Sequence, residues 1–199
     1  MNREEALALL DKHGPVDASW RGHCLQVGAT ARRLAELISQ RSHPVDVDRA
    51  EVLGLLHDLG RSQKHSLRHG IEGYLLARAA GLEVEGRICL LHVLKGRTLK
   101  EGIRLGMLTE EERSELEAGD FTPPSLCLEE KLAILADALM SDTGLVPIEE
   151  KYANARRRYG ANPHHYQDEE WVKELAEEIA QLLGQSPYQA LKDLNDDLP

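Results

Sequence analysis

Three apolar segments of this chain are each interrupted by a histidine, an aspartate or both. They read GLLHDLG (54–60), ICLLHVL (88–94) and LAILADALM (132–140). Segments this apolar belong in a core, and a polar group buried there costs free energy unless it has a partner. The simplest solution is a fold that brings these segments together and supplies shared partners for His57, Asp58, His92 and Asp137.

The rest of the chain also follows a helical period. Between residues 20 and 38 the apolar side chains recur at spacings of three and four, which places them on one helix face. Residues 48–59 are apolar nearly all round, which is typical of a buried helix. Further helices are expected at 70–80, 84–94, 110–116, 128–141, 148–159 and 168–183. No strand-length alternation or Gly-rich phosphate loop is visible, so the sequence predicts an all-α helical bundle.

A single domain accounts best for 199 residues, a length sufficient to bury a core. We expect the core of the domain at about 20–142 and additional C-terminal helices at about 146–184. Residues 95–127 are predicted to be a polar insertion.

Composition limits the kinds of binding partner and the cellular compartment that we expect for this protein. The three cysteines include no Cys-x-x-Cys pair, which favours a reducing cytoplasm. The acidic N-terminus is unlike a signal peptide, and no apolar run approaches the roughly 18 residues of a membrane span, so no membrane partner is expected. A net charge of −10 disfavours binding to nucleic-acid polymers. A small anionic ligand remains compatible with a site that contains cations.

A divalent metal is the simplest shared partner for the buried polar groups. Histidine nitrogens and carboxylate oxygens converging from several helices are common metal ligands in helical bundles. Two more histidines join the set, because His23 lies at the margin of the apolar face of the first long helix and His69 opens the helix at 70–80. The candidate metal ligands are therefore His23, His57, Asp58, His69, His92 and Asp137.

This ordered pattern resembles the HD-domain superfamily of metal-dependent phosphohydrolases, in its form with the order His, His-Asp, His, His, Asp. HDLG is similar to the His-Asp-Ile-Gly signature of that superfamily, and HGIEGYLL and LAILADALM resemble two of its other segments. Two departures are visible. Arg61 stands where lysine is common, and the chain after His92 lacks the Gly-Tyr-Pro element of the cyclic-di-nucleotide phosphodiesterase branch.

The resemblance implies one or two divalent ions, of Mn, Fe, Mg, Zn or Co. His23, His57, Asp58 and Asp137 would hold one ion, and Asp58 would bridge to a second one held by His69 and His92. A pair of such ions activates a water molecule for attack on phosphorus. Asp58 and Arg61 are then the expected catalytic residues, with Arg61 holding phosphate oxygens through paired hydrogen bonds. Lys64 and Lys95 are weaker candidates for the same contact.

The function expected from this pattern is hydrolysis of a nucleotide or another small phosphorylated substrate. Three alternatives stay open: a dinucleoside-polyphosphate hydrolase of the same superfamily, a di-iron oxygenase of HD fold, and a non-catalytic nucleotide-binding module. Simpler structural roles also exist, since Asp137 could pair with a basic side chain and Arg61 could cap a helix. His65 is interpreted as a loop residue and His164-His165 as a surface turn. The oligomeric state is left open.

Overall fold

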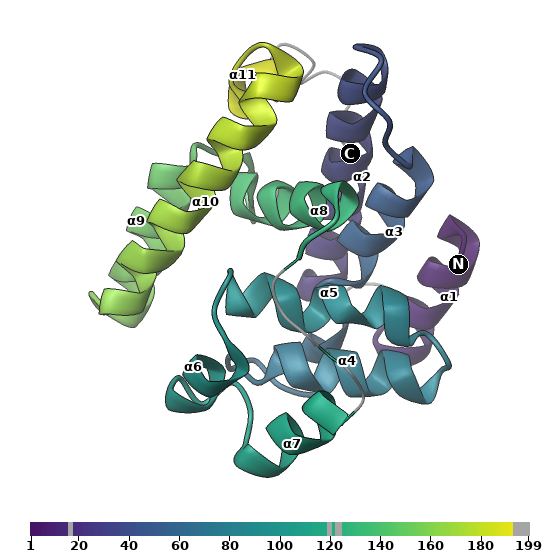
Figure 1. Cartoon of the computed structure of the whole chain (residues 1–199), viewed down its shortest axis with the longest axis vertical. Helices are drawn as coiled ribbons and strands as arrows, with labels where there is room; N and C mark the ends of the chain where they lie inside the picture. Colours follow the sequence, from purple (N-terminus) through teal and green to yellow (C-terminus); the bar gives the residue numbers. More distant parts are fainter. Residues whose placement is uncertain (16–17, 119–120, 122–124, 193–199) are drawn as a thin grey trace.

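A computed structural model describes residues 1–15, 18–118, 121 and 125–192 of the chain. Almost all regular structure in this part is helical, which confirms the all-α fold class (Figure 1). The elements in chain order are α1 (Arg3–His13), α2 (Ser19–Ser39), α3 (Val47–Leu56), the 3-10 helix η1 (Leu59–Ser62), α4 (His69–Ala79), α5 (Glu83–Leu94), α6 (Leu99–Arg104), α7 (Glu110–Ala118), α8 (Leu128–Leu139), β1 (Met140–Ser141), β2 (Gly144–Leu145), α9 (Ile148–Tyr159), α10 (Pro163–Leu183) and α11 (Pro187–Lys192).

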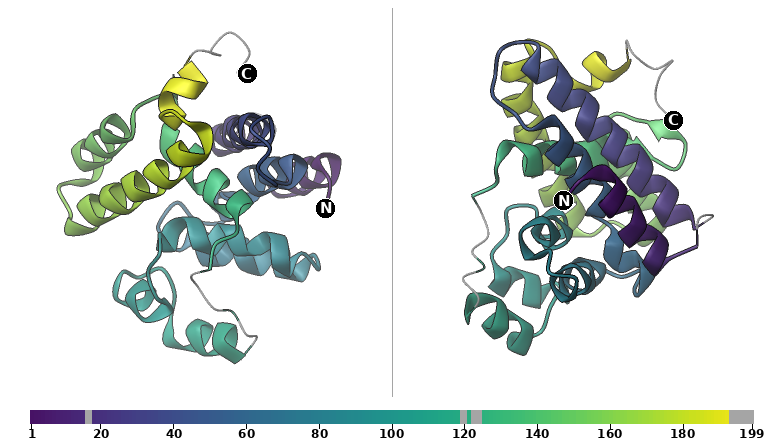
Figure 2. Two further views of the ribbon diagram at one scale, coloured as in Figure 1. Left: turned by 45° about the horizontal axis from the view of Figure 1, so that its top comes forward. Right: turned by 90° about the vertical axis from the view of Figure 1, so that its right-hand side faces the viewer.

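Helix α8 lies in the middle of the bundle. Figures 1 and 2 show it between the α2–α3 pair and the α9–α10 pair. Helices α4 and α5 lie below it in the view of Figure 1. Helix α2 buries the stripe that the sequence predicts, including Cys24, Val27 and Ala31. Helix α3 is buried from Ala50 to Leu56. The three apolar segments that contain histidine or aspartate therefore meet in one core.

Two glycine contacts set the spacing between the elements that carry the polar residues. A Cβ on Gly54 would lie 2.8 Å from the Cα of Gly28, so α2 and α3 touch backbone to backbone. A Cβ on Gly60 would lie 1.9 Å from the carbonyl oxygen of His69, which shows how closely η1 approaches α4. Any larger side chain at either position would push apart the helices that carry the candidate ligands.

Several elements go beyond the sequence prediction. Helices α1, α6 and α11 and the two-residue antiparallel hairpin β1–β2 were not expected. The expected polar insertion is partly packed, since Leu99, Met107, Leu108 and Leu116 are buried, while its residues 119–120 and 122–124 lie outside the described part. The prediction of a surface turn at His164-His165 is wrong. Both lie in the first turn of α10, which begins at Pro163, a residue whose fixed φ suits a helix start.

The C-terminal helices form a pair against α8. Helices α9 and α10 run side by side in Figures 1 and 2. Arg97, which follows α5, forms an ion pair with Asp168 of α10. Within the described residues, no helix is both long enough and apolar enough to cross a membrane.

Candidate metal centre

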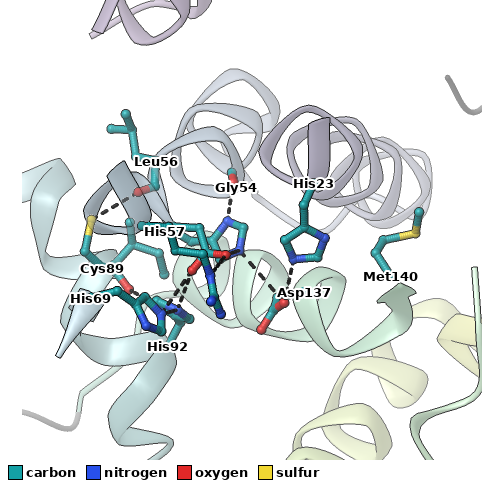
Figure 3. Close-up of polar contacts among 12 residues, drawn as sticks. His23, Gly54, Leu56, His57, His69, Cys89, His92, Asp137 and Met140 are labelled. Atoms are coloured by element: carbon teal, nitrogen blue, oxygen red, sulfur yellow. Dashed lines mark hydrogen bonds and ion pairs between the residues drawn. The ribbon is translucent and has the colours of Figure 1, made fainter. Parts of the chain in front are cut away.

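All six candidate ligands converge on one region, from α2, the α3–η1 junction, α4, α5 and α8 (Figure 3). They form two groups, in each of which the potential ligand atoms lie within 4.8 Å of one another. The first triad is His23, His57 and Asp137, and the second triad is Asp58, His69 and His92.

The first triad is centred on the carboxylate of Asp137. Its Oδ1 lies 3.0 Å from Nε2 of His23 and 3.8 Å from Nε2 of His57. These atoms come from three different helices or helix ends, so none of the contacts is imposed by local chain geometry. The triad offers two imidazole nitrogens and one carboxylate to an ion.

The second triad is centred on Asp58. Its Oδ1 lies 3.0 Å from Nε2 of His69 and 3.4 Å from Nε2 of His92, and these two nitrogens are 2.9 Å apart. The other carboxylate oxygen, Oδ2, lies 3.7 Å from Nε2 of His57. Asp58 thus groups with the second triad while reaching toward the first, which is the position of a residue that could bridge two ions.

Backbone contacts orient three of these imidazoles. Nδ1 lies 2.7 Å from the Gly54 carbonyl in His57, 2.6 Å from the Ser66 carbonyl in His69 and 3.2 Å from the Ile88 carbonyl in His92. A carbonyl only accepts, so each Nδ1 carries the proton and donates it. In the neutral form, each ring then directs the lone pair of Nε2 into the site, as metal-binding histidines do.

The chemistry of this donor set fits a divalent metal. With both Nδ1 atoms protonated and both rings neutral, Nε2 of His69 and Nε2 of His92 face each other with two lone pairs 2.9 Å apart, a contact that becomes favourable when a metal ion binds to both or when one ring takes up a proton. Nε2 of His57 and Oδ1 of Asp58 are buried and make no hydrogen bond. Leaving such groups unpaired is costly, and a metal ion satisfies both kinds of acceptor.

Burial and neighbouring charges shift the pKa values of His57, Asp58 and Asp137 toward the protonation states in which these side chains bind metals. Burial lowers the pKa of His57 to about 3, so its ring is neutral near pH 7. Burial alone would raise the pKa of Asp58, but the close contacts of its carboxylate with His57, His69 and His92 outweigh it and hold that pKa well below its usual range. For Asp137 burial also acts upward, and Lys151 with His23 and His57 holds the pKa well below normal.

Arg61 contacts Asp58, one of the six candidate metal ligands. Its Nε donates to Oδ2 of Asp58 at 2.5 Å, and its side chain lines a cavity beside the two triads. Among the weaker candidates, Lys95 donates from Nζ to the His92 carbonyl at 2.6 Å and so caps the end of α5. The described lining of the cavity includes neither Lys64 nor Lys95, whereas the exposed loop residue His65 does belong to it.

The cavity has a volume of about 450 Å³. Three of the candidate ligands, His23, Asp58 and Asp137, belong to its lining. Its walls come from the start of α2 at Ser19 and Trp20, from the hairpin at 140–143 and from one face of α9. Both triads therefore have a member that borders a cavity partly built by α9, while His57, His69 and His92 lie buried behind it.

The sequence prediction missed the α9 side of this cavity. Nζ of Lys151 donates to Oδ1 of Asp137 at 3.2 Å, to the Asp137 carbonyl at 2.6 Å and to the Met140 carbonyl at 2.5 Å. A signal was present, because Lys151 falls between Ile148 and Tyr152, which α9 buries. A lysine next to the buried face of a helix is a candidate partner for a buried carboxylate.

Comparisons with known proteins agree with this geometry. The HD domain family model matches residues 20–142. The chain is 35% identical over 141 residues to an uncharacterized protein of Methanocaldococcus jannaschii, covering 70% of this chain and 77% of that protein. It is 26% identical over 197 residues to a tRNA (cytidine(56)-2'-O)-methyltransferase of Picrophilus torridus, covering 97% of this chain but only 50% of that protein. No solved structure gives a significant match. The chain belongs to the HD domain family, whose members are typically metal-dependent hydrolases.

Proposed function

We propose that this protein is a metal-dependent phosphohydrolase that acts on a small phosphorylated substrate, most simply a nucleotide. The observation that supports the proposal best is the set of unpaired acceptors beside the cavity, with Nε2 of His57 and Oδ1 of Asp58 both buried and without hydrogen bonds. Buried acceptors without a hydrogen bond are expected where a bound cation takes the place of the missing donor.

The two triads provide the places where one or two divalent ions would be held. When bound, such ions lower the pKa of a water molecule and offset negative charge that develops on phosphorus. The mixture of imidazoles and carboxylates suits Mn, Fe, Zn or Co and also accepts Mg. The low pKa of Asp58 and of Asp137 keeps both carboxylates ionised for this role near neutral pH.

Arg61 is the proposed phosphate contact. A guanidinium has five N–H donors, and Asp58 takes the one on Nε. Because the side chain also lines the cavity, other donors of the same group can bind phosphate oxygens there. The ion pair with Asp58 would fix the plane of the guanidinium before the substrate arrives.

The size of the cavity favours a small molecule. A volume of about 450 Å³ falls within the range of roughly 300–1,000 Å³ that small-ligand pockets occupy. The net charge of −10 also disfavours a long polyanion as the substrate. Cations at the cavity provide the local attraction that a single phosphate group needs.

A phosphate-release screen tests the proposal. Nucleotides, dinucleoside polyphosphates and sugar phosphates would be incubated with the protein and Mn²⁺, Mg²⁺, Co²⁺, Zn²⁺ or Fe²⁺, both anaerobically and in air. We expect release of phosphate or a phosphomonoester that stops when Asp58→Asn removes the central carboxylate and persists in His43→Ala, a substitution at an exposed loop position. Oxygen consumption without hydrolysis would replace the proposal with an oxygenase. Absence of hydrolysis with every metal would refute it.

A further inference from the structure

Helix α9 turns one row of side chains toward the cavity. Lys151, Asn154, Ala155, Arg158 and Tyr159 line it, at spacings of three, one, three and one residues. These spacings place the five residues along one face of the helix. The row lies outside residues 20–142, the part matched by the family model.

The two ends of the row differ: Lys151, at the inner end, holds the end of α8, whereas Arg158 and Tyr159, at the outer end, are largely exposed. Lys151 is hydrogen bonded to the side chain and carbonyl of Asp137. Arg158 lies seven residues further along α9, which at 1.5 Å per residue is roughly 10 Å from Lys151. The outer end of the row therefore lies about two helical turns beyond the residue that contacts Asp137, and still lines the same cavity as Arg61.

Tyr159 is the most exposed large hydrophobic residue of the described chain. It is 77% exposed although it belongs to the wall of a cavity. An aromatic ring in this state offers a free face on which a flat ligand can stack. Beside it Arg158 lies 3.4 Å from Asp142 in the hairpin turn, an ion pair between two largely exposed side chains that joins the two walls at the cavity mouth.

We propose that Tyr159 is the platform of a base-binding subsite at the cavity mouth. A nucleotide would place its phosphate beside Arg61 and the two triads, and its base would stack on the ring of Tyr159. This inference rests on the proposed phosphohydrolase function and narrows its substrate from any small phosphate ester to those that carry a nucleobase. Stacking on an aromatic ring tolerates all bases, so the subsite selects for a base without selecting among bases.

The test compares substrates with and without a base. Kinetics and calorimetric binding would be measured for the four common nucleoside 5'-monophosphates and for ribose 5-phosphate, on the metal-loaded protein. We expect Tyr159→Ala to raise KM and Kd for the nucleotides about tenfold or more and to leave those for ribose 5-phosphate unchanged. Tyr159→Phe keeps the ring and should retain nucleotide binding. Tyr166→Ala is the matched control, because Tyr166 is also exposed, at 54%, and packs beside Arg156 outside the cavity lining.

The outcomes separate the subsite from the reaction. Equal effects of Tyr159→Ala on nucleotides and ribose 5-phosphate, or no effect on either, would overturn the subsite even if both are hydrolysed. Binding of nucleotides that depends on Tyr159 without any hydrolysis would support the subsite and refute the proposed function. Strong preference for an oligonucleotide end over the mononucleotides would overturn the inference of a small substrate.

Discussion

The contacts of Lys151 lead to a quantitative prediction about the link between α9 and the candidate metal centre. Its ammonium group donates to the Asp137 carboxylate, the Asp137 carbonyl and the Met140 carbonyl. The two carbonyls lie at the C-terminal end of α8, where a cation is favoured, and the Asp137 carbonyl also accepts from the N–H of Met140. Lys151→Met keeps the length and apolar stem of the side chain and removes all three donors.

The size of the effect follows from the number of hydrogen bonds and their exposure. Each hydrogen bond contributes a net of about 1 kcal/mol, and one to a charged group contributes more. The Lys151 side chain is 27% exposed, so water recovers part of the loss. We therefore expect the free energy of unfolding to fall by about 2–3 kcal/mol, and Tm to fall by roughly 4–12 °C for a chain of this size.

Thermal and urea unfolding of the metal-free protein would measure this loss, with Lys131→Met as the matched control. Lys131 lies on α8 and pairs with the exposed Glu178 at 2.5 Å, a surface contact expected to contribute at most about 1 kcal/mol. Lys151→Met should also lower kcat/KM about tenfold, because Asp137 loses a group that orients it. If both variants unfold alike and keep full activity, Lys151 does not hold the centre in place.

Three further predictions concern the metal, the pH and the phosphate contact. Chelation should lower Tm by roughly 5–16 °C, because a metal present at 100–1,000 times its Kd stabilises the folded state by about 2.7–4.1 kcal/mol. A melting curve that changes neither after EDTA nor after addition of Mn²⁺ would contradict this. In the metal-free protein the pKa of His57 is about 3 in the folded state, so the unfolded chain gains a proton near pH 6.5 that the folded one does not. The free energy of unfolding should therefore be highest above pH 6.5 and should fall by about 1.4 kcal/mol per pH unit as the pH drops toward 3. Urea unfolding that gives the same free energy at pH 7 and at pH 5 would rule this out. Arg61→Ala should lower kcat/KM roughly tenfold to a hundredfold without loss of bound metal, and Arg61→Lys should recover only part of it; reduced Tm with unchanged kcat/KM would instead make Arg61 purely structural.

The ligand set could be predicted because the cost of burial is visible in the sequence. His57, Asp58, His92 and Asp137 interrupt segments that are otherwise apolar, and such residues require polar or ionic partners in any fold that buries them. Helical periodicity also predicted most of the bundle. Both signals are local in the chain and need no knowledge of how the helices cross.

The arrangement of the ligands depended on contacts that no local pattern contains. The division into two triads follows from the approach of α2 to α3 at Gly28 and Gly54 and of η1 to α4 at Gly60. A glycine in a helix is compatible with many packing partners, so its sequence position does not identify the helix that it touches. The expected grouping, with His57 beside His23 and Asp137 and with Asp58 reaching His69 and His92, therefore came from the family resemblance and not from the local pattern.

The α9 wall was missed for a similar reason. The hairpin β1–β2 has only two residues in each strand, too few for alternation to be visible. This hairpin reverses the chain after α8 and lets α9 return past Asp137, which brings Lys151 and Tyr159 to the cavity. Helices α6 and α11 have six residues each, short enough that turn signals conceal their period.

The most direct test of the account is anomalous X-ray diffraction from crystals of the Mn²⁺-loaded protein, recorded on both sides of the manganese absorption edge. The account predicts one manganese peak among His23, His57 and Asp137 and a second among Asp58, His69 and His92. Asp58→Asn crystals should lose the second peak. Manganese peaks found only away from these six side chains, or none in crystals soaked at saturating Mn²⁺, would contradict the assignment of a metal centre to this site.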